Sequence, residues 1–265
     1  MSGLKPSQSV GIQVRIRGQV PYGAETYARE KVLAAISHVS EPVLATRVKL
    51  AQAAHAPAGR PATAQAMVDV NGRPVRAHVA AGTMFEAVDL LQERLTARLA
   101  RVHRYGVRRL RGSDPDGHMR WDGEDHEHRP HRHHLPADER RMVRHKAFSL
   151  ARQTPEDALI DLEAMDYDFW VFTDLTSGSD SVVYRDSHTG GHRMASLGPV
   201  GQDREIEGLL SVSTVPVTTS DVGEAVQRLQ LTGLPFVFFK DSGTGRGSVL
   251  YHRFDGHYGL ITPAR

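Results

Sequence analysis

The chain has 265 residues, 40% of them hydrophobic, and contains no cysteine. It is long enough for two or three domains with apolar cores, whereas disulfides and thiolate chemistry are excluded. No run approaches the roughly 20 apolar residues of a membrane span, and the N-terminal residues are polar, so we expect a cytoplasmic protein.

The charge is distributed unevenly along the chain. The formal net charge is +2, but residues 1–112 contain 17 Lys and Arg against 7 acidic residues, and the remainder contains 16 against 24. The first part therefore carries +10 and the second −8. A positive excess of this size is typical of a domain that binds a polyanion. The alternative is a basic surface that only keeps the protein in solution.

Apolar residues alternate with polar ones in four segments of the first part, which predicts four strands. These segments are 10–16, 43–51, 64–70 and 74–80. The last two are joined by Asn71-Gly72, a dipeptide typical of tight hairpins. A helix is expected over 21–40, and a longer helix starts after Thr83 as its N-cap, with apolar residues every three or four positions from Met84 to Val102. Residues 1–111 are thus predicted to form a β-α-β-β-β-α domain.

The longer helix also carries a basic stripe at helical spacing. It comprises Arg94, Arg98, Arg101, Arg104 and Arg108. Like charges at this spacing repel each other, so a stripe without acidic partners favours a polyanionic ligand. Arginine suits phosphate because its planar fork donates two parallel hydrogen bonds. Further basic residues on outward strand positions could widen the patch: Arg15, Arg17, Arg47, Lys49, Arg76 and His78.

The kind of nucleic acid is suggested by what the basic part lacks. Aromatic residues are only 6% of the chain, so base stacking is not the expected mode of binding. A rigid ridge of arginines fits structured RNA, which proteins recognise largely by shape and backbone. The alternative is a transcription regulator that binds duplex DNA, which would need side chains that read base edges.

Residues 112–140 are rich in Pro, Gly and acidic residues and contain six histidines. This composition predicts a flexible linker without a packed core. The histidine spacing fits no closed zinc site, so we expect adventitious metal binding at most. No metal site and no cofactor are predicted.

The second half of the chain contains an internal repeat. Residues 169–184 recur as residues 236–251 with a constant offset of 67. Two copies are too few for a solenoid. They predict two small α+β modules over 141–199 and 207–265, each a strand, a helix and two or three further strands. Thr154 and Asp221 open the expected helices.

A module of this size has a small core and gains stability by pairing. The short connection around 198–207 supplies an effective concentration on the order of millimolar, so we expect the copies to pair within one chain and the protein to be a monomer. The expected pairing residues are Phe169, Val171, Val183, Phe236, Phe238 and Leu250.

Several segments resemble the long-form ribosome hibernation-promoting factors. Lys146-Ala147-Phe148, Asp168 to Phe172 and the ending Asp255 to Pro263 are similar to that family's C-terminal module, also called the sigma-54 modulation/S30EA C-terminal domain. Tyr27 to Lys31 and Met84 to Leu91 resemble the two helices of its ribosome-binding domain. The family usually has one C-terminal module, whereas this chain has two.

The resemblance implies a protein that is not an enzyme. It implies binding to the small ribosomal subunit in the channel for mRNA and tRNA, with inhibition of translation and protection of idle ribosomes. Ribosomal RNA would be contacted by Arg15, Arg17, Arg29, Lys31, Arg76 and the arginine stripe. The family's module commonly homodimerises and joins two ribosomes, but pairing within one chain predicts single idle ribosomes. An enzyme is the remaining alternative, but the chain has no nucleophile elbow, zinc-protease motif or P-loop.

Overall fold

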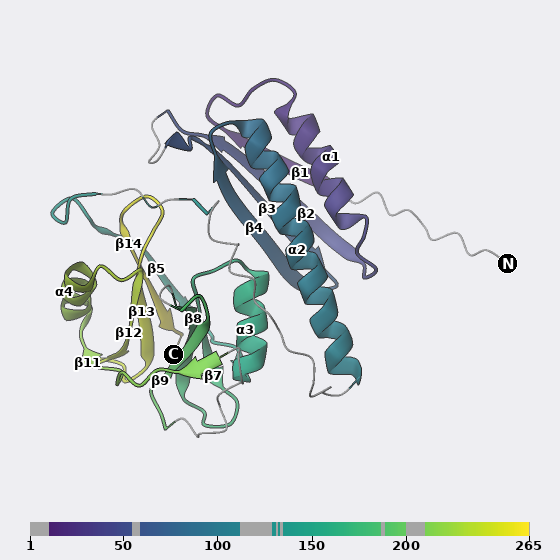
Figure 1. Ribbon diagram of the computed structural model, residues 1–265. Helices are drawn as coiled ribbons and strands as arrows, with labels where there is room; N and C mark the ends of the chain where they lie inside the picture. The colour runs from purple at the N-terminus through teal and green to yellow at the C-terminus, as the bar shows by residue number, and fades with distance from the viewer. Residues whose placement is uncertain are drawn as a thin grey trace. The chain divides into compact units, whose positions relative to one another are not determined.

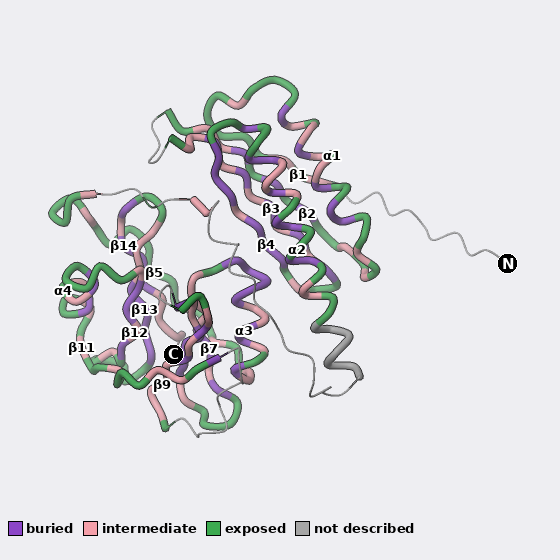
Figure 2. Tube along the Cα trace, viewed as in Figure 1, coloured by how far each residue is buried: buried purple, intermediate pink, exposed green. Residues whose placement is uncertain are grey.

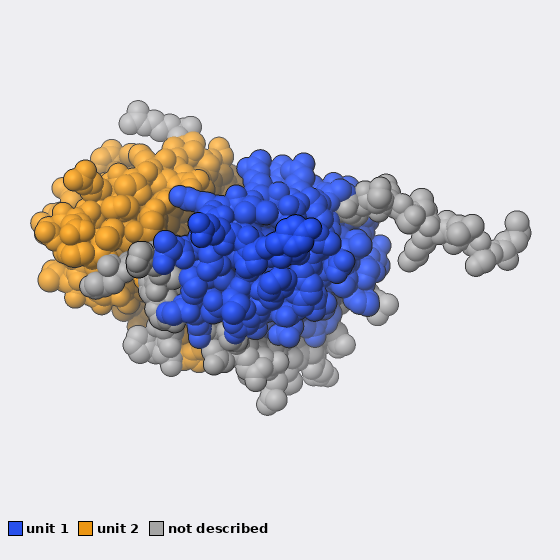
Figure 3. All heavy atoms as spheres, turned by 90° about the horizontal axis from the view of Figure 1, so that it is seen from above, with its two compact units in different colours: residues 1–113, 125–130, 164–166 blue, residues 114–124, 131–163, 167–265 orange. Residues whose placement is uncertain are grey.

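The computed structural model describes residues 11–54, 59–111, 129–130, 132, 135–186, 189–199 and 210–264 (Figure 1), with backbone alone for 105–111. The chain divides into two compact units, shown in different colours in Figure 3. The first comprises residues 1–113, 125–130 and 164–166, and the second comprises 114–124, 131–163 and 167–265. Most of the predicted linker, and most of the connection at 198–207, lie outside the described residues.

The first unit is a four-stranded sheet with two helices, as predicted from the sequence. Its elements are β1 (Ile12–Arg17), α1 (Ala24–Ile36), β2 (Val43–Gln52), β3 (Ala62–Val70), β4 (Arg73–Ala81) and α2 (Met84–Arg111). The strand order is β1-β2-β3-β4, with β1 parallel to β2 and the other neighbours antiparallel. Both helices cover the same face of the sheet (Figure 1).

The core of the first unit forms between this face and the apolar stripe of α2. Met84, Leu91 and Leu95 are buried against the inward residues of the strands. The predicted hairpin between β3 and β4 has positive φ at Asn71 (51°) and Gly72 (84°), the geometry of a type I′ turn. The Glu86 backbone N–H donates to the Thr83 hydroxyl (3.2 Å), which confirms Thr83 as the N-cap of α2.

The second unit contains two five-stranded sheets. Its elements in chain order are β5 (Met142–Phe148), β6 (Arg152–Gln153), α3 (Pro155–Ala164), β7 (Phe169–Asp174), β8 (Asp180–Arg185), β9 (His192–Ser196), β10 (Leu210–Val212), β11 (Thr219–Ser220), α4 (Val222–Thr232), β12 (Phe236–Asp241), β13 (Gly247–His252) and β14 (Tyr258–Pro263). The strand orders are β10-β9-β8-β7-β6 and β11-β12-β13-β14-β5. Each sheet therefore corresponds mainly to one sequence repeat.

The leading strand of each repeat joins the sheet of the other repeat. β5 precedes the first repeat but pairs in parallel with β14, and β10 precedes the second repeat but pairs in parallel with β9. The sequence pattern assigned each leading strand to its own module, so this exchange is a correction. Edge strands leave backbone groups unpaired, and either copy can satisfy them. The exchange interlocks the two copies through backbone hydrogen bonds.

The helices of the two modules begin where the sequence predicted. The Asp157 backbone N–H donates to the Thr154 hydroxyl at 3.2 Å. Asp221 forms a capping box with Glu224, and Gly233 ends α4 with a φ of 64°. These local signals act within a few residues, so they are independent of how the modules pair.

In the described part of the second unit, three apolar clusters hold the fold together. One lies between α3 and its sheet and another between α4 and its sheet. The third includes Val171, Val182, Phe236 and Val249 and joins the two sheets. Figure 2 shows buried residues along both sheets. Among the helices in the described part of the chain, none is long and apolar enough to cross a membrane.

Candidate nucleic-acid interface and module interface

The sheet of the first unit presents basic residues on the face opposite its helices. The register places Arg15 beside Lys49, Lys49 beside Gln65, and Gln65 beside His78. A second row on the same face runs from Arg47 through Met67 to Arg76. Strand alternation explains the segregation, because the residues between them point into the core.

Arg17 follows Arg15 on the same face of β1. Four basic residues of this face are exposed: Arg15, Arg17, Arg47 and Lys49. Within the described residues, none of the four belongs to an ion pair. An exposed row of uncompensated positive charge on a rigid sheet is suited to contact with a phosphate backbone. We call these four residues the open-face cations.

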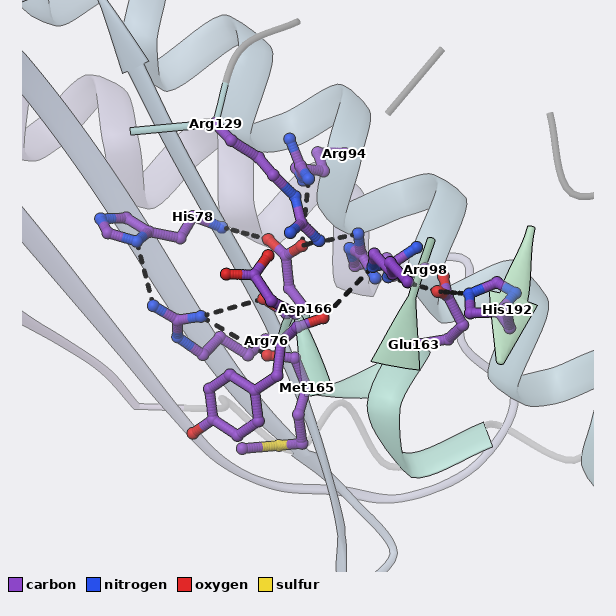
Figure 4. Close-up of polar contacts among 12 residues, drawn as sticks. Arg76, His78, Arg94, Arg98, Arg129, Glu163, Met165, Asp166 and His192 are labelled. Atoms are coloured by element: carbon purple, nitrogen blue, oxygen red, sulfur yellow. Dashed lines mark hydrogen bonds and ion pairs between the residues drawn. The ribbon is translucent and has the colours of Figure 1, made fainter. Parts of the chain in front are cut away.

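A second basic group surrounds Asp166 at the β4 edge of the same unit (Figure 4). One carboxylate oxygen of Asp166 accepts from Arg94 at 3.0 Å, from Arg98 at 2.8 Å and from Arg129 at 2.7 Å. The other carboxylate oxygen accepts from the backbone N–H of His78 at 3.2 Å. The side chain of Asp166 is only 2% exposed, so these contacts are shielded from water. We call this set of donors the arginine cage.

Arg76 extends the cage toward the open face. Its guanidinium donates to the backbone carbonyls of Met165 and Asp166, both at 3.5 Å, and to the side-chain oxygen of Gln65 at 3.2 Å. A ring nitrogen of His78 lies 3.0 Å from Arg76. Burial, reinforced by the nearby Arg76 charge, lowers the pKa of His78 to about 3. The neutral ring can therefore accept a hydrogen bond from Arg76.

Asp166 has a left-handed backbone, with φ of 53°. Such a conformation in a residue other than glycine costs about 1–3 kcal/mol and persists where its surroundings fix it. Here the surrounding guanidiniums and the His78 amide provide that fixation. A carboxylate and a phosphate present similar acceptor oxygens to arginine. The cage is thus an oxyanion site that is occupied by a residue of the chain itself.

The residues proposed to contact RNA fall into separate groups. The structure brings Arg76, Arg94 and Arg98 together around Asp166 and buries all three. Farther along the stripe, Arg101 is half-buried and Arg104 is exposed, while the side chain of Arg108 lies outside the description. Sequence reasoning missed Arg129, because it belongs to the predicted linker and no local pattern assigns it to the stripe.

Two proposed RNA contacts on α1 have acidic neighbours. Arg29 forms an ion pair with Glu25 (2.8 Å) and also donates to the Ile12 carbonyl. Lys31 forms an ion pair with Asp89 (2.7 Å), and this hydrogen bond raises the pKa of Lys31. Both side chains lie on the helical side of the unit, away from the open-face cations. The structure therefore does not unite all the sequence-predicted cations in one patch.

In the second unit, aromatic rings connect the two modules reciprocally. The ring centroids of Phe169 and Phe236 are 4.7 Å apart. Phe169 also contacts Tyr251 (5.6 Å), and Phe236 contacts Tyr184 (5.4 Å). Since Phe169 corresponds to Phe236 and Tyr184 to Tyr251 in the repeat, the last two contacts are the same contact seen from each side. The modules therefore face each other about an approximate twofold axis.

The predicted pairing residues divide between this interface and the module cores. Phe169, Val171, Phe236 and Phe238 lie in the cluster between the sheets. Val183 instead packs in the α3 cluster and Leu250 in the α4 cluster, which corrects the prediction for these two. Successive side chains of a strand point to opposite faces, so their neighbours Val182 and Val249 face the other module.

A buried polar group fastens α3 to its sheet. Glu163, whose side chain is 3% exposed, forms an ion pair with Arg185 and lies 3.0 Å from the Nε2 atom of His192. These partners come from β8 and β9. Buried charges are tolerated when they are paired in this way. The group therefore anchors the first module and offers no reactive side chain to solvent.

Comparisons with known proteins agree with the repeat in the sequence. Residues 137–190 and 209–260 each match the family described as Sigma 54 modulation/S30EA ribosomal protein C terminus. Two separate segments of the chain are thus similar to this domain, the one whose motifs were identified in the sequence.

Curated relatives match only part of their own length. A dormancy associated translation inhibitor from Mycobacterium tuberculosis is 40% identical over 144 residues, which cover 51% of this chain and 52% of that protein. A ribosome hibernation promotion factor from Deinococcus radiodurans is 47% identical over 51 residues, or 18% of this chain and 26% of that protein. The chain therefore spans about half of the first relative and about a quarter of the second.

Among solved structures, the N-terminal domain of Protein Y from Thermus thermophilus is similar to part of the chain. It has a TM-score of 0.29 and 21% sequence identity, and the match covers 35% of this chain and 98% of that structure.

Proposed function

We propose that this chain, which has two segments similar to the S30EA C-terminal domain, is a cytoplasmic ribosome hibernation factor. It binds the small ribosomal subunit in the channel for mRNA and tRNA, inhibits translation and protects idle ribosomes. The names of the relatives support this reading: one is a translation inhibitor and another a ribosome hibernation promotion factor. The function is one of binding, and no reaction is assigned to the chain.

The observation that supports this function best is the row of open-face cations. Arg15, Arg17, Arg47 and Lys49 lie on adjacent strands, are exposed, and belong to the half of the chain with the +10 charge. Contacts of this kind neutralise phosphates and release counterions, so binding should weaken steeply with salt. A sheet face that lacks aromatic residues suits the backbone of folded RNA better than single-stranded bases.

The arginine cage forms the second part of the proposed RNA interface. Arg94 and Arg98 bind the carboxylate of Asp166, so they would contact RNA after a phosphate group has replaced that carboxylate. The open-face cations need no such exchange. We therefore assign the first contact with RNA to the open face, and the contacts of Arg76, Arg94 and Arg98 to a later step.

The second unit is proposed to keep the protein monomeric on single ribosomes. The supporting observation is that the apolar faces of the two modules cover each other within one chain. The exchanged strands β5 and β10 reinforce this arrangement. A module face that is already covered has no apolar surface left for the module of another molecule.

Co-sedimentation with purified small subunits tests the proposal directly. The test variant carries Arg15→Glu and Lys49→Glu, and a charge-matched control carries Arg152→Glu and Lys240→Glu at exposed positions of the second unit. The loss of two phosphate contacts should weaken binding at least about 10-fold. It should also make the salt dependence shallower: the magnitude of the slope of log K, the binding constant, against log salt should fall by about 2. The control should bind like the unchanged protein.

Three results would contradict the proposal. Equal binding by the test and control variants would remove the open face from the interface. Tighter binding to random duplex DNA than to subunits would favour the transcription regulator. A peak of paired ribosomes on sucrose gradients with purified components would show that the modules join two molecules.

A further inference from the structure

Equivalent residues of the two modules meet at the approximate twofold axis. Phe169 faces Phe236, its equivalent 67 residues later. Asp180 likewise faces Gly247, because a Cβ atom built on Gly247 would lie only 2.7 Å from the Cβ of Asp180. A residue that faces its own equivalent must lie close to the axis. If two identical modules paired in the same way, two copies of that residue would therefore face each other.

The two copies differ at this axis. Asp180 is 5% exposed. Its carboxylate accepts from the backbone N–H of Gly247 at 2.9 Å and from the Arg246 guanidinium at 2.7 and 3.0 Å. The equivalent of Arg246 in the first copy is Ser179. The buried carboxylate and its arginine thus come from different modules, and the reverse pair does not exist.

Gly247 is needed for space rather than for backbone conformation. The turn glycines that precede this position, Gly178 and Gly245, have nearly the same φ (67° and 68°). The two hairpin turns therefore have the same backbone conformation at this point. Gly247 itself is outside the left-handed region, and Asp180 adopts the equivalent position. A Cβ on Gly247 would also approach the ring of Phe238 to 2.9 Å. The first copy has the smaller Val171 at that ring's equivalent position.

We infer that these three differences make the module faces unlike, so that the first module accepts the second module and rejects a second copy of itself. A pair of first modules would place two Asp180 side chains at the axis, too close together and without an arginine. Two buried like charges that share one site destabilise each other strongly.

A pair of second modules would be weakened for a different reason. Two Gly247 residues would meet without a clash, but each Arg246 would lack a carboxylate, and two Phe238 rings would replace one Phe and one Val. The loss should be smaller, because Arg246 is 44% exposed and can be solvated. The preferred partner of each module is therefore the unlike module. This order of preference holds whatever the first unit binds.

The test uses three variants of the whole chain, built from exchanges at equivalent positions. The first gives the second module the residues of the first: Phe238→Val, Arg246→Ser and Gly247→Asp. The second gives the first module the residues of the second: Val171→Phe, Ser179→Arg and Asp180→Gly. The third combines all six substitutions. It therefore restores a pair of unlike faces, with the axis residues of the two modules exchanged. Melting temperature and light scattering are measured for each.

The melting temperature of the first variant should fall by about 10 °C or more, as expected for two buried like charges in a domain of this size. The melting temperature of the second variant should fall by only a few degrees. The melting temperature of the third should lie within about 3 °C of that of the unchanged protein, and this variant should be monomeric. Its recovery would exclude a general intolerance of these positions, since it contains every substitution of the other two.

Other outcomes would overturn the inference. If the third variant is no more stable than the first, or does not fold, the axis residues are not interchangeable and do not set the pairing. If the first and second variants lose the same stability, Asp180 does not discriminate between like and unlike modules.

Discussion

Replacing Asp166 by Asn tests how much one carboxylate contributes to the β4 edge of the first unit. The Asp166 side chain is 2% exposed, and three guanidiniums donate to it at 2.7–3.0 Å. Asn keeps the size of the side chain but loses the negative charge. Removal of one partner from a buried ion pair costs about 3–5 kcal/mol, because the remaining charges are left uncompensated. Asp166→Asn should therefore lower the free energy of local unfolding by about that amount.

Asp168 provides a matched control two residues away. Its carboxylate pairs with Arg132, and the two side chains are 31% and 35% exposed. Exposed pairs of this kind contribute about 0–1 kcal/mol. Asp168→Asn removes the same charge from the same stretch of chain and should change stability by less than about 1 kcal/mol.

Hydrogen exchange of the whole chain measures the difference. Peptides from β4 and from residues 84–100 of α2 should exchange about 100-fold to 4000-fold faster in Asp166→Asn, since 1.4 kcal/mol corresponds to a factor of ten. The same peptides should exchange nearly unchanged in Asp168→Asn. Equal protection in the two variants would refute the reasoning and show that the cage arginines do not depend on this carboxylate.

The same variant also tests the assignment of the cage to a later step of RNA binding. If phosphate must displace the carboxylate, Asp166→Asn should bind the small subunit more tightly than the unchanged protein does. Asp168→Asn should not. Weaker binding by Asp166→Asn, with the open-face cations intact, would remove the cage from the proposed interface.

Three further changes have defined outcomes. Asp221→Ala should cost about 1 kcal/mol and accelerate hydrogen exchange in the first turn of α4, because the capping box is lost. Gly72→Ala should lower the melting temperature through a cost of about 1–2 kcal/mol, because φ is +84°. Burial alone would raise the pKa of Asp180, but the hydrogen bonds from Arg246 and Gly247 lower it below its ordinary value. Its stabilisation is therefore present above about pH 4 and lost as the pH falls through the lowered pKa. Asp180→Asn should flatten acid unfolding over this range, and an unchanged acid profile would contradict this assignment.

Local patterns in the sequence predicted the elements of the first unit, and the helices and main hairpins of the second, correctly. Alternation with period two located the strands of the first unit, and the apolar stripe from Met84 to Val102 located α2. Thr83 and Asp221 marked helix starts, and Asn71-Gly72 marked a hairpin. Each of these signals depends on backbone preferences within a few residues, which are the same in any tertiary context. The repeat with its offset of 67 predicted the duplicated module in the same way.

Periodicity shows which residues share a face, but it does not show what that face meets. The arginine stripe placed Arg94 and Arg98 together, yet nothing near them in sequence indicates that both would bind Asp166. The repeat predicted two modules, yet only the tertiary structure showed that β5 completes the sheet of the second copy and β10 that of the first. The alternation along β8 and β13 leaves open which face meets the helix, and the structure decided that Val182 and Val249, rather than Val183 and Leu250, meet the other module. These outcomes depend on contacts between residues far apart in the chain, where the partner is chosen by packing and charge rather than by local conformation.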